Sequence, residues 1–257
     1  MTDNEIYDAA FYARQVEGAE RSARAIVPLL AELVAPRSVI DIGCGLGAWL
    51  AVWRERDGVD VLGLDGSHMP DAERRIPASC FRAHDLARPL ELERRFDLAL
   101  CLEVAEHLDV EAGDHLVEGL TTVSDVVYFS AAIPFQGGAG HQNERWPSYW
   151  AERFVARGFT PIDAIRPRVW DDPGVVWWYA QNGLLFVRDS ALEANAALRR
   201  EADATPPRPL DVVHPRAFEA LVDPDRVSLR RALRYARRAL RRRVGGKPSR
   251  KPNTARP

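Results

Sequence analysis

Two histidines and one glutamate are the residues of this sequence best suited to proton transfer. His107 closes the phrase E-V-A-E-H after an apolar run, and His141 and Glu144 lie in the glycine-rich segment I-P-F-Q-G-G-A-G-H-Q-N-E. A neutral imidazole, whose ordinary pKa is about 6.5, is a suitable general base for a hydroxyl group. A carboxylate such as Glu144 is able to orient a catalytic histidine. The sequence does not rank His107 against His141 as the base.

A glycine-rich stretch at residues 38–50, S-V-I-D-I-G-C-G-L-G-A-W-L, predicts a strand, a tight turn and a helix. Its β-branched first half is typical of a buried parallel strand. The glycines that follow remove Cβ atoms, so a ligand is able to lie against bare backbone. The free amides and positive dipole end of the next helix favour a negative group. The stretch therefore predicts a site for a nucleotide-like cofactor.

Two classes of cofactor fit this turn. Gly43, Gly45 and Ala48 satisfy the dinucleotide fingerprint G-x-G-x-x-G/A. Asp41 stands just before the first glycine, where it would attract the ammonium of an amino-acid group and repel a pyrophosphate. Asp65 follows the turn by about 20 residues, a spacing that lets it accept from the ribose hydroxyls of either cofactor. Asp41 therefore favours a nucleoside that carries an amino-acid group.

Three motifs resemble the S-adenosylmethionine-dependent methyltransferases of the Rossmann-like class. Residues 41–47 read like the first motif of that family, D-I-G-C-G-x-G, and residues 96–108 are similar to its pattern F-D-h-h-h-x-x-E-V-h-E-H-h, in which h is apolar. The phrase W-W-Y-A-Q-N at 177–182 resembles bacterial members encoded among glycan and secondary-metabolite genes. The resemblance spans roughly residues 37–190, and it implies methyl transfer from S-adenosylmethionine.

The resemblance also implies which residues hold the cofactor. Asp85 would accept from the adenine amino group, although a plain helix cap is the other interpretation of this residue. Glu103 and His107 are four apart, so one helical turn would present both on the same side. The cofactor-binding set is Asp41, Gly43, Cys44, Gly45, Gly47, Asp65, Gly66, Asp85, Leu86 and Glu103. The catalytic set is His141, His107 and Glu144, and the sequence shows no metal-ligand constellation, so we expect a metal-free mechanism.

The remaining pattern predicts an α/β fold with a three-layer, Rossmann-like methyltransferase sheet. We expect the sheet to be mostly parallel and to end in a C-terminal antiparallel hairpin. The hairpin strands are predicted at Phe159–Arg166 and Val175–Arg188, on either side of a D-D-P-G turn. Such a hairpin is what the methyltransferase resemblance implies, and a dinucleotide-binding half does not require it.

The predicted domains follow the same pattern. Residues 1–36 form an N-terminal helical cap, in which Tyr7 and Tyr12 either touch ligand or pack the cap, and residues 37–190 form the S-adenosylmethionine-binding domain. Residues 191–225 are expected to be a linker, and residues 226–257 a basic amphipathic helix with a disordered tail.

The segment from 133 to 150 predicts a substrate-facing lid. Its three closely spaced glycines are typical of a mobile loop, and mobile loops commonly cover active sites. The alternative is a loop latched down by its aromatic residues. Flat aromatic faces would also suit sugar rings, although burial in the core is the commoner use of any one of them. The aromatic candidates are Trp146, Tyr149, Trp150, Trp177 and Trp178.

The charges of the chain are unevenly distributed. Of the 35 Lys and Arg residues, 13 lie in residues 226–257, which contain no Asp or Glu, so the remainder has 22 basic residues against 37 acidic ones. A basic amphipathic helix suits an anionic membrane surface or a nucleic acid, and it also suits docking on an acidic body. Three cysteines without metal-ligand spacing, together with an acidic, polar beginning, predict a cytoplasmic protein, peripheral at the inner membrane face if the helix binds lipid.

Three functions are therefore weighed. The leading one is O-methylation of a sugar, glycan or secondary-metabolite hydroxyl, with a small-molecule or glycan acceptor as partner. A nucleic-acid methyltransferase that uses the basic tail is the second, but the fourth strand leads into C-L-E-V, whereas enzymes that methylate base amino groups carry a D/N-P-P-Y type motif. An NAD-dependent oxidoreductase is the third, because the glycine fingerprint alone fits it.

Overall fold

The computed structural model describes residues 9–66, 73–205 and 209–223, together with 232–233, 236–237 and 240. The chain divides into two compact units, residues 1–214 and residues 215–257. The first unit contains the sheet and the candidate site, and the second contains helix α9 (Pro215–Val222). Tyr7 and the side chain of Tyr12 lie outside the described residues, as does most of the predicted basic helix.

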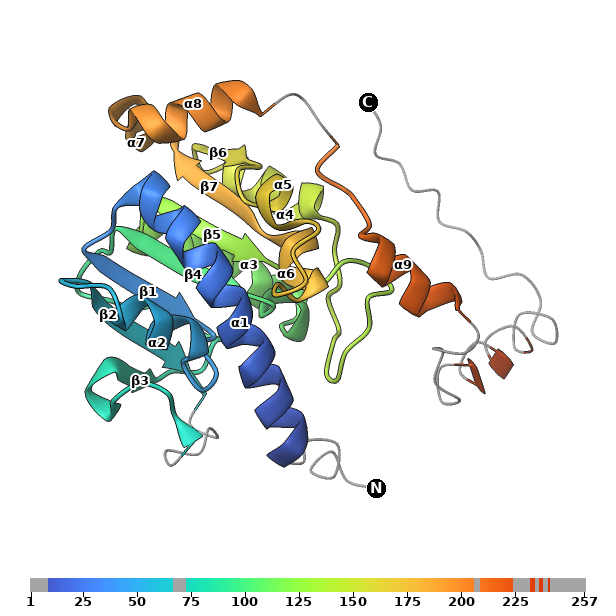
Figure 1. The fold of residues 1–257 in the computed structure, drawn as a ribbon. Coiled ribbons are helices and arrows are strands. Elements are labelled where there is room, and N and C mark those ends of the chain that lie inside the picture. Colours follow the sequence, from blue (N-terminus) through green and yellow to red (C-terminus); the bar gives the residue numbers. More distant parts are fainter. Residues whose placement is uncertain are drawn as a thin grey trace. The chain divides into compact units, whose positions relative to one another are not determined.

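Among the described residues, seven strands form one sheet in the order β3-β2-β1-β4-β5-β7-β6 (Figure 1). Strand β7 pairs antiparallel with both β5 and β6, and the other pairings are parallel. The predicted α/β sheet is confirmed. The strands are β1 (Ser38–Ile42), β2 (Asp60–Asp65), β3 (Phe81–Ala83), β4 (Leu98–Leu102), β5 (Val126–Ser130), β6 (Phe159–Ile162) and β7 (Leu184–Arg188).

Helices cover both faces of the sheet and make the three layers. In Figure 1, α1 (Ala9–Val34) and α2 (Ala48–Arg54) lie in front of the sheet. They share a buried cluster with α8 (Ala196–Ala204), whereas α3 (Val110–Val123) and α4 (Pro147–Val155) pack in the cluster of the other face. Successive side chains of a strand point to opposite faces, so the apolar run of β4 supplies both clusters. Buried runs of this kind are therefore central strands.

The antiparallel end of the sheet differs from the predicted hairpin. The D-D-P-G turn does not join two long strands, because two helices, α5 (Arg166–Val169) and α6 (Trp177–Asn182), lie between β6 and β7. The phrase W-W-Y-A-Q-N is helix α6, and the strand begins only at Leu184. Strand β7 lies between β5 and β6 and pairs with both, and its apolar residues are buried, so this short strand is held in the sheet on both sides.

Residues 191–225, expected as a linker, carry helical structure. Helix α7 (Asp189–Ala194) and helix α8 bury Leu192 and Leu198 in the first core cluster. Asn195 caps α8 by accepting from the amides of Ala197 and Leu198. The two buried leucines therefore pack α7 and α8 on the first core cluster, and the asparagine cap stabilises the start of α8.

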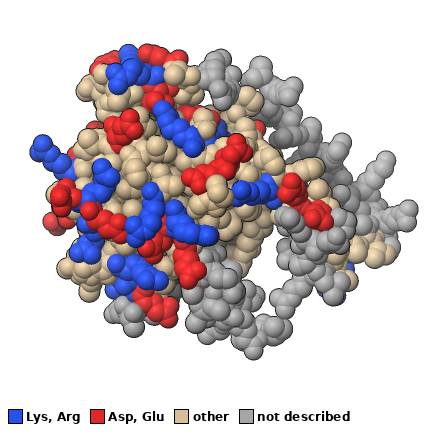
Figure 2. All heavy atoms as spheres, viewed as in Figure 1, with Lys and Arg blue, Asp and Glu red and all other residues tan. Residues whose placement is uncertain are grey.

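Charged side chains of the described residues are mixed on the face shown in Figure 2, where Arg side chains lie among Asp and Glu. Several of them form exposed ion pairs, such as Arg24 with Glu20 and Glu55. Exposed pairs of this kind contribute little to stability. In the part of the chain that the structure describes, no helix has the length and apolar character needed to cross a membrane.

Candidate active site

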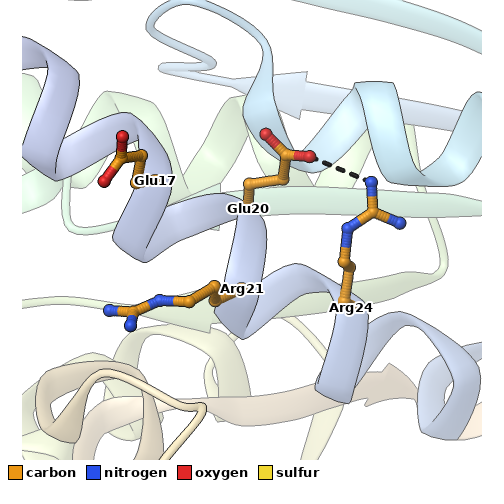
Figure 3. A pocket seen from close by; sticks show the side chains of 4 residues that line it. All are labelled: Glu17, Glu20, Arg21 and Arg24. Atoms are coloured by element: carbon orange, nitrogen blue, oxygen red, sulfur yellow. Dashed lines mark hydrogen bonds and ion pairs between the residues drawn. The ribbon is translucent and has the colours of Figure 1, made fainter.

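A hollow of about 440 Å³ lies along α1 and is lined by Glu17, Glu20, Arg21 and Arg24 (Figure 3). Its acidic and basic side chains come from one helix, and Arg24 donates to Glu20 across 2.9 Å. The hollow is a solvated charged surface of one helix and not a place for chemistry. The site must instead lie where the order of the sheet reverses, between the carboxyl ends of β1 and β4.

The glycine turn, residues 43–47, joins β1 to α2 at that edge. Its three glycines all have positive φ, which side chains rarely adopt. A Cβ on Gly43 would lie 2.2 Å from a methyl group of Val104, and one on Gly47 would lie 2.8 Å from Ile76. A Cβ on Gly45 would have no heavy atom within 4 Å among the atoms described. Gly45 is therefore the glycine that borders open space, where a ligand fits.

Asp65 binds the glycine turn directly. One oxygen of its carboxylate accepts from the amide of Gly45 at 2.7 Å, and the other accepts from the amide of Gly66 at 2.6 Å. Each oxygen retains acceptor capacity toward a hydroxyl group. The end of β2 therefore places a carboxylate beside the open face of Gly45, as the predicted ribose contact requires.

Asp41 lies in the centre of β1 and is almost fully buried. Burial raises the pKa of Asp41 from 3.8 to about 8, and the nearby charge of Asp65 adds to the effect. Cys44, the non-glycine residue beside Gly45, is also buried, and its amide donates to the carbonyl of Leu64. Backbone hydrogen bonds to Leu64 therefore hold the turn on β2, and the buried carboxyl group of Asp41 precedes it on β1.

Asp85 and Leu86 follow β3, but Asp85 is exposed. Its carboxylate accepts from the amide of Ala87 at 3.1 Å and lies 3.7 Å from the guanidinium of Arg88. These contacts stabilise a surface turn, and no described helix begins at Asp85 for it to cap. Its predicted contact with adenine stays a prediction.

Glu103 ends β4 in a left-handed conformation with φ of 57°. Its two oxygens accept from the amides of Gln136 at 2.9 Å and Asn182 at 3.0 Å, and Asn182 also donates to Gln136 at 3.1 Å. Burial raises the pKa of Glu103, and these hydrogen bonds oppose the rise. The carboxylate is therefore held by two segments that are distant from it in the sequence.

The turn after Glu103 differs from the predicted helical turn. A 3-10 helix, η4 (Ala105–His107), begins only after the left-handed residue, so Glu103 and His107 are not on one α-helical turn. The residue that turns inward is Glu106, which is fully buried. Because Val104 packs on Gly43, this turn and the glycine turn are direct neighbours.

The lid loop, residues 131–146, is latched onto η4 by its backbone. The amides of Gln142 and Asn143 both donate to the carbonyl of Glu106, at 2.9 and 3.0 Å, and the Gln142 side chain donates to the carbonyl of His107 at 2.6 Å. Polar contacts, and not the aromatic residues, therefore fix the register of this loop. They bring His141 to the same place as His107.

His107 and His141 meet edge to face, with ring centroids 4.7 Å apart. The Nδ1 atom of His141 lies 3.1 Å from the carboxylate of Glu144, which also accepts from the amides of Phe135 and Gly137. Although His107 is partly open to solvent, desolvation by the chain packed around it, with the charge of His141, lowers its pKa from 6.5 to about 4. The structure thus brings the three predicted catalytic residues together, with a carboxylate orienting His141.

Two glycines of the lid loop allow the backbone to pack closely against the imidazoles of His107 and His141. A Cβ on Gly138 would lie 2.1 Å from the Nε2 atom of His141, and one on Gly140 would lie 3.4 Å from the Nδ1 atom of His107. These residues are therefore needed for close packing around the two imidazoles.

The aromatic candidates separate into two groups. Trp150 is buried and packs on Phe129, with ring centroids 5.5 Å apart, so it is a core residue. Tyr149 lies under the guanidinium of Arg153. Trp146, Trp177 and Trp178 are partly exposed and keep faces available to a ligand.

Sequence reasoning missed Glu106, Gln136 and Asn182. Each lies in a phrase that the sequence analysis quoted, but nothing in the phrase marks its side chain as part of the site. The only signal for Glu106 in the sequence is its spacing, since it is a second acidic residue three positions after Glu103. The two amides are recognised only when β4, the lid loop and α6 meet.

Comparison with known proteins gives the class. Residues 12–116 match a protein-family model described as a methyltransferase domain. No curated protein sequence matches the chain.

Solved structures share the fold. The amino pentose methyltransferase CalS10 of Micromonospora echinaspora is 15% identical, with a TM-score of 0.52 over 71% of this chain and 97% of that one. DesVI of Streptomyces venezuelae is 15% identical, with a TM-score of 0.52 over 73% and 99%. The sugar N-methyltransferase KedS8 of Streptoalloteichus is 16% identical, with a TM-score of 0.53 over 70% and 91%.

The fold is that of the Rossmann-like methyltransferases, and the family match covers α1 through the start of α3, where the glycine turn lies. Residues 12–116 are thus similar to a methyltransferase domain, and the described sheet has the fold of solved methyltransferases. CalS10 is described with S-adenosylmethionine bound.

Proposed function

We propose that this enzyme methylates a hydroxyl group of a sugar or a similar small molecule. The observation that carries the proposal is the cluster of His107, His141 and Glu144 beside the glycine turn. A hydroxyl must lose its proton to become a good nucleophile, whereas a neutral amine attacks with the lone pair that it already has. A site with two imidazoles and an orienting carboxylate is therefore suited to oxygen as the acceptor.

S-adenosylmethionine supplies a methyl group on a sulfonium when it is bound. In the proposed site, Asp65 accepts from its ribose hydroxyls, and Asp41 and Glu103 attract its ammonium group. The lid loop covers the acceptor and excludes water, and the partly exposed indoles of Trp177 and Trp178 form a face for a sugar ring. The protein's residues position the acceptor and remove the proton of its hydroxyl group.

Structures with the same fold support a sugar acceptor. CalS10 is described as an amino pentose methyltransferase and KedS8 as a sugar N-methyltransferase. Both descriptions name a sugar as the acceptor, and that of KedS8 names nitrogen as the methylated atom. The choice of oxygen for this enzyme rests on the histidines alone.

A labelled methyl donor tests the proposal. We expect transfer to at least one member of a panel of nucleotide sugars and polyketide glycosides, at an oxygen that NMR of the product identifies. His141→Ala should lower kcat by roughly 10²–10⁴-fold and leave affinity for S-adenosylhomocysteine unchanged. His115→Ala is the matched control, because His115 lies on α3 outside the cluster. Transfer to amino sugars alone would replace oxygen by nitrogen as the acceptor.

A further inference from the structure

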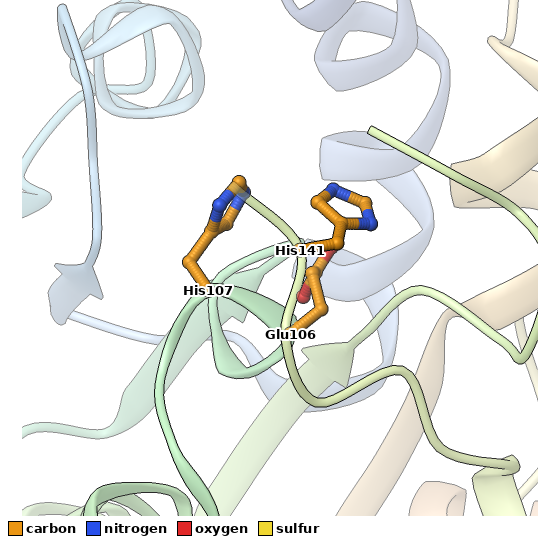
Figure 4. Close-up of side chains that lie close together, drawn as sticks. All are labelled: Glu106, His107 and His141. Carbon is orange, nitrogen blue, oxygen red and sulfur yellow. The ribbon is translucent and has the colours of Figure 1, made fainter. Parts of the chain in front are cut away.

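The turn after β4 and the lid loop place three potential metal ligands together. One ligand atom from each of Glu106, His107 and His141 lies within 4.8 Å of the others (Figure 4). Two donors about 2.1 Å from one ion are separated by roughly 3–4 Å, so a small contraction of the group is enough to bind an ion. The sequence did not indicate this group because its members are not spaced as a metal motif.

Glu106 provides an independent reason to expect a ligand. Its side chain is fully buried, and neither carboxylate oxygen makes a hydrogen bond of good geometry to a described residue, although the backbone of Ala132 and the carboxyl group of Glu103 lie close to it. A buried carboxyl group without a well-formed hydrogen bond is costly, and such groups are normally paired or bound to a metal. Glu106 points into the same space as the two imidazoles, as Figure 4 shows.

The surroundings hold this group in place. The carbonyl of Glu106 accepts two amides of the lid loop, which fixes His141 relative to the turn. Glu144 binds one ring nitrogen of His141, as carboxylates do behind metal-binding histidines, and so leaves the other nitrogen to a ligand. Two further backbone amides hold Glu144 itself. The arrangement is thus organised before any ion arrives.

We propose that Glu106, His107 and His141 bind one divalent first-row transition-metal ion, which activates the acceptor hydroxyl. Two imidazoles and one carboxylate suit Mn²⁺, Fe²⁺, Co²⁺ or Zn²⁺ better than Mg²⁺, which prefers oxygen ligands alone. Three protein ligands leave coordination positions open for the acceptor. This inference rests on the proposed function, and it replaces the metal-free mechanism that the sequence suggested.

The cation changes how the acceptor loses its proton. As a Lewis acid it lowers the pKa of the hydroxyl, whose proton passes to water as the acceptor binds and before the lid loop excludes solvent. An oxygen lone pair then forms the O–CH₃ bond, while the C–S bond breaks and its electron pair stays on sulfur. The products are the methyl ether, S-adenosylhomocysteine and one proton. In this chemistry the histidines serve as ligands, and Glu144 acts as a positioning residue through His141.

Binding of Mn²⁺ to the untagged full chain tests the site without reference to activity. The protein is treated with EDTA, exchanged into metal-free buffer with S-adenosylhomocysteine, and titrated with Mn²⁺ while the signal of the free ion is followed by electron paramagnetic resonance. We expect one bound Mn²⁺ per chain. Glu106→Gln and His107→Ala should each weaken binding at least ~10-fold, and His115→Ala should bind as the wild type does.

Both variants should fold, because His107 is exposed and Gln keeps the shape of Glu106, and thermal unfolding verifies this. The inference is overturned if the wild type binds S-adenosylhomocysteine but no Mn²⁺, or if His107→Ala binds Mn²⁺ as tightly as the wild type. Failure of the proposed function would look different, since Mn²⁺ would bind while no sugar in the panel accepted a methyl group.

Discussion

Asp41 shows how a single buried carboxyl group responds to its cofactor. Its folded-state pKa of about 8 means that it is mostly protonated near pH 7 before the cofactor binds. The unfolded chain loses this proton near pH 4, so Asp41 lowers stability progressively as the pH rises from about 4 to about 8. A bound ammonium group would favour the charged carboxylate and reverse this loss.

We therefore expect the binding of S-adenosylhomocysteine at pH 7 to release close to one proton. Calorimetric titration in buffers of different ionisation enthalpy measures this number. Asp41→Asn should bind more weakly and release no proton from this position. Equal proton release by the variant and the wild type would show that Asp41 does not meet the ammonium.

Substitutions at two glycines of the same turn should have different effects, one mainly on the stability of the fold and the other mainly on ligand binding. Gly43→Ala adds a Cβ 2.2 Å from Val104 in a left-handed conformation, whereas Gly45→Ala is strained in φ but meets no described atom. We expect Gly43→Ala to lower the free energy of unfolding by about 2–4 kcal/mol. Gly45→Ala should cost about 1 kcal/mol and chiefly weaken S-adenosylhomocysteine binding. Chemical denaturation and calorimetric titration distinguish them, and equal loss of stability would contradict the assignment of Gly45 to the ligand side.

At the scale of elements, the carboxylate of Glu144 ties the glycine-rich part of the lid loop together. Glu144 accepts from the amides of Phe135 and Gly137 and holds His141, so it joins the two ends of the loop. Phe135 is exposed and has a positive φ of 75°, a conformation that needs such support.

Glu144→Ala should therefore loosen the loop. Limited proteolysis is expected to cut the variant within residues 135–141 faster than the wild type, and kcat should fall by at least ~10-fold because His141 loses its orientation. Glu144→Gln retains one acceptor oxygen and should be intermediate. If Glu144→Ala is cleaved no faster than the wild type, other contacts hold the loop.

At the scale of the whole molecule, the basic segment remains to be assigned a partner. Leu233 and Leu240 are helical and are 49% and 61% exposed, on the predicted apolar stripe between arginines. An exposed apolar stripe with basic flanks suits an anionic bilayer.

Deleting residues 226–257 should abolish sedimentation with vesicles that contain anionic phospholipid and leave S-adenosylhomocysteine binding intact. The full chain should bind these vesicles less at high salt, and it should not bind neutral ones. Unchanged vesicle binding by the deletion variant would reject the membrane role. Salt-sensitive retention of RNA in a filter assay would favour nucleic acid instead.

The sequence by itself determined the glycine turn and the aspartate that follows it. A glycine turn between a buried strand and a helix, and the aspartate that ends the next strand, obey local rules of backbone geometry and spacing, so Gly45 and Asp65 were found and the structure joins them by a hydrogen bond. His107 and His141 were recognised as chemically capable because of what an imidazole does.

Only the tertiary structure decided what surrounds those histidines. Glu106 becomes a buried carboxyl group without a well-formed hydrogen bond because Glu103 adopts a left-handed conformation and turns the chain into a 3-10 helix. Asn182 reaches Glu103 because α6 packs beside β5. These contacts join segments up to 79 residues apart in the chain, and no local propensity encodes such a distance.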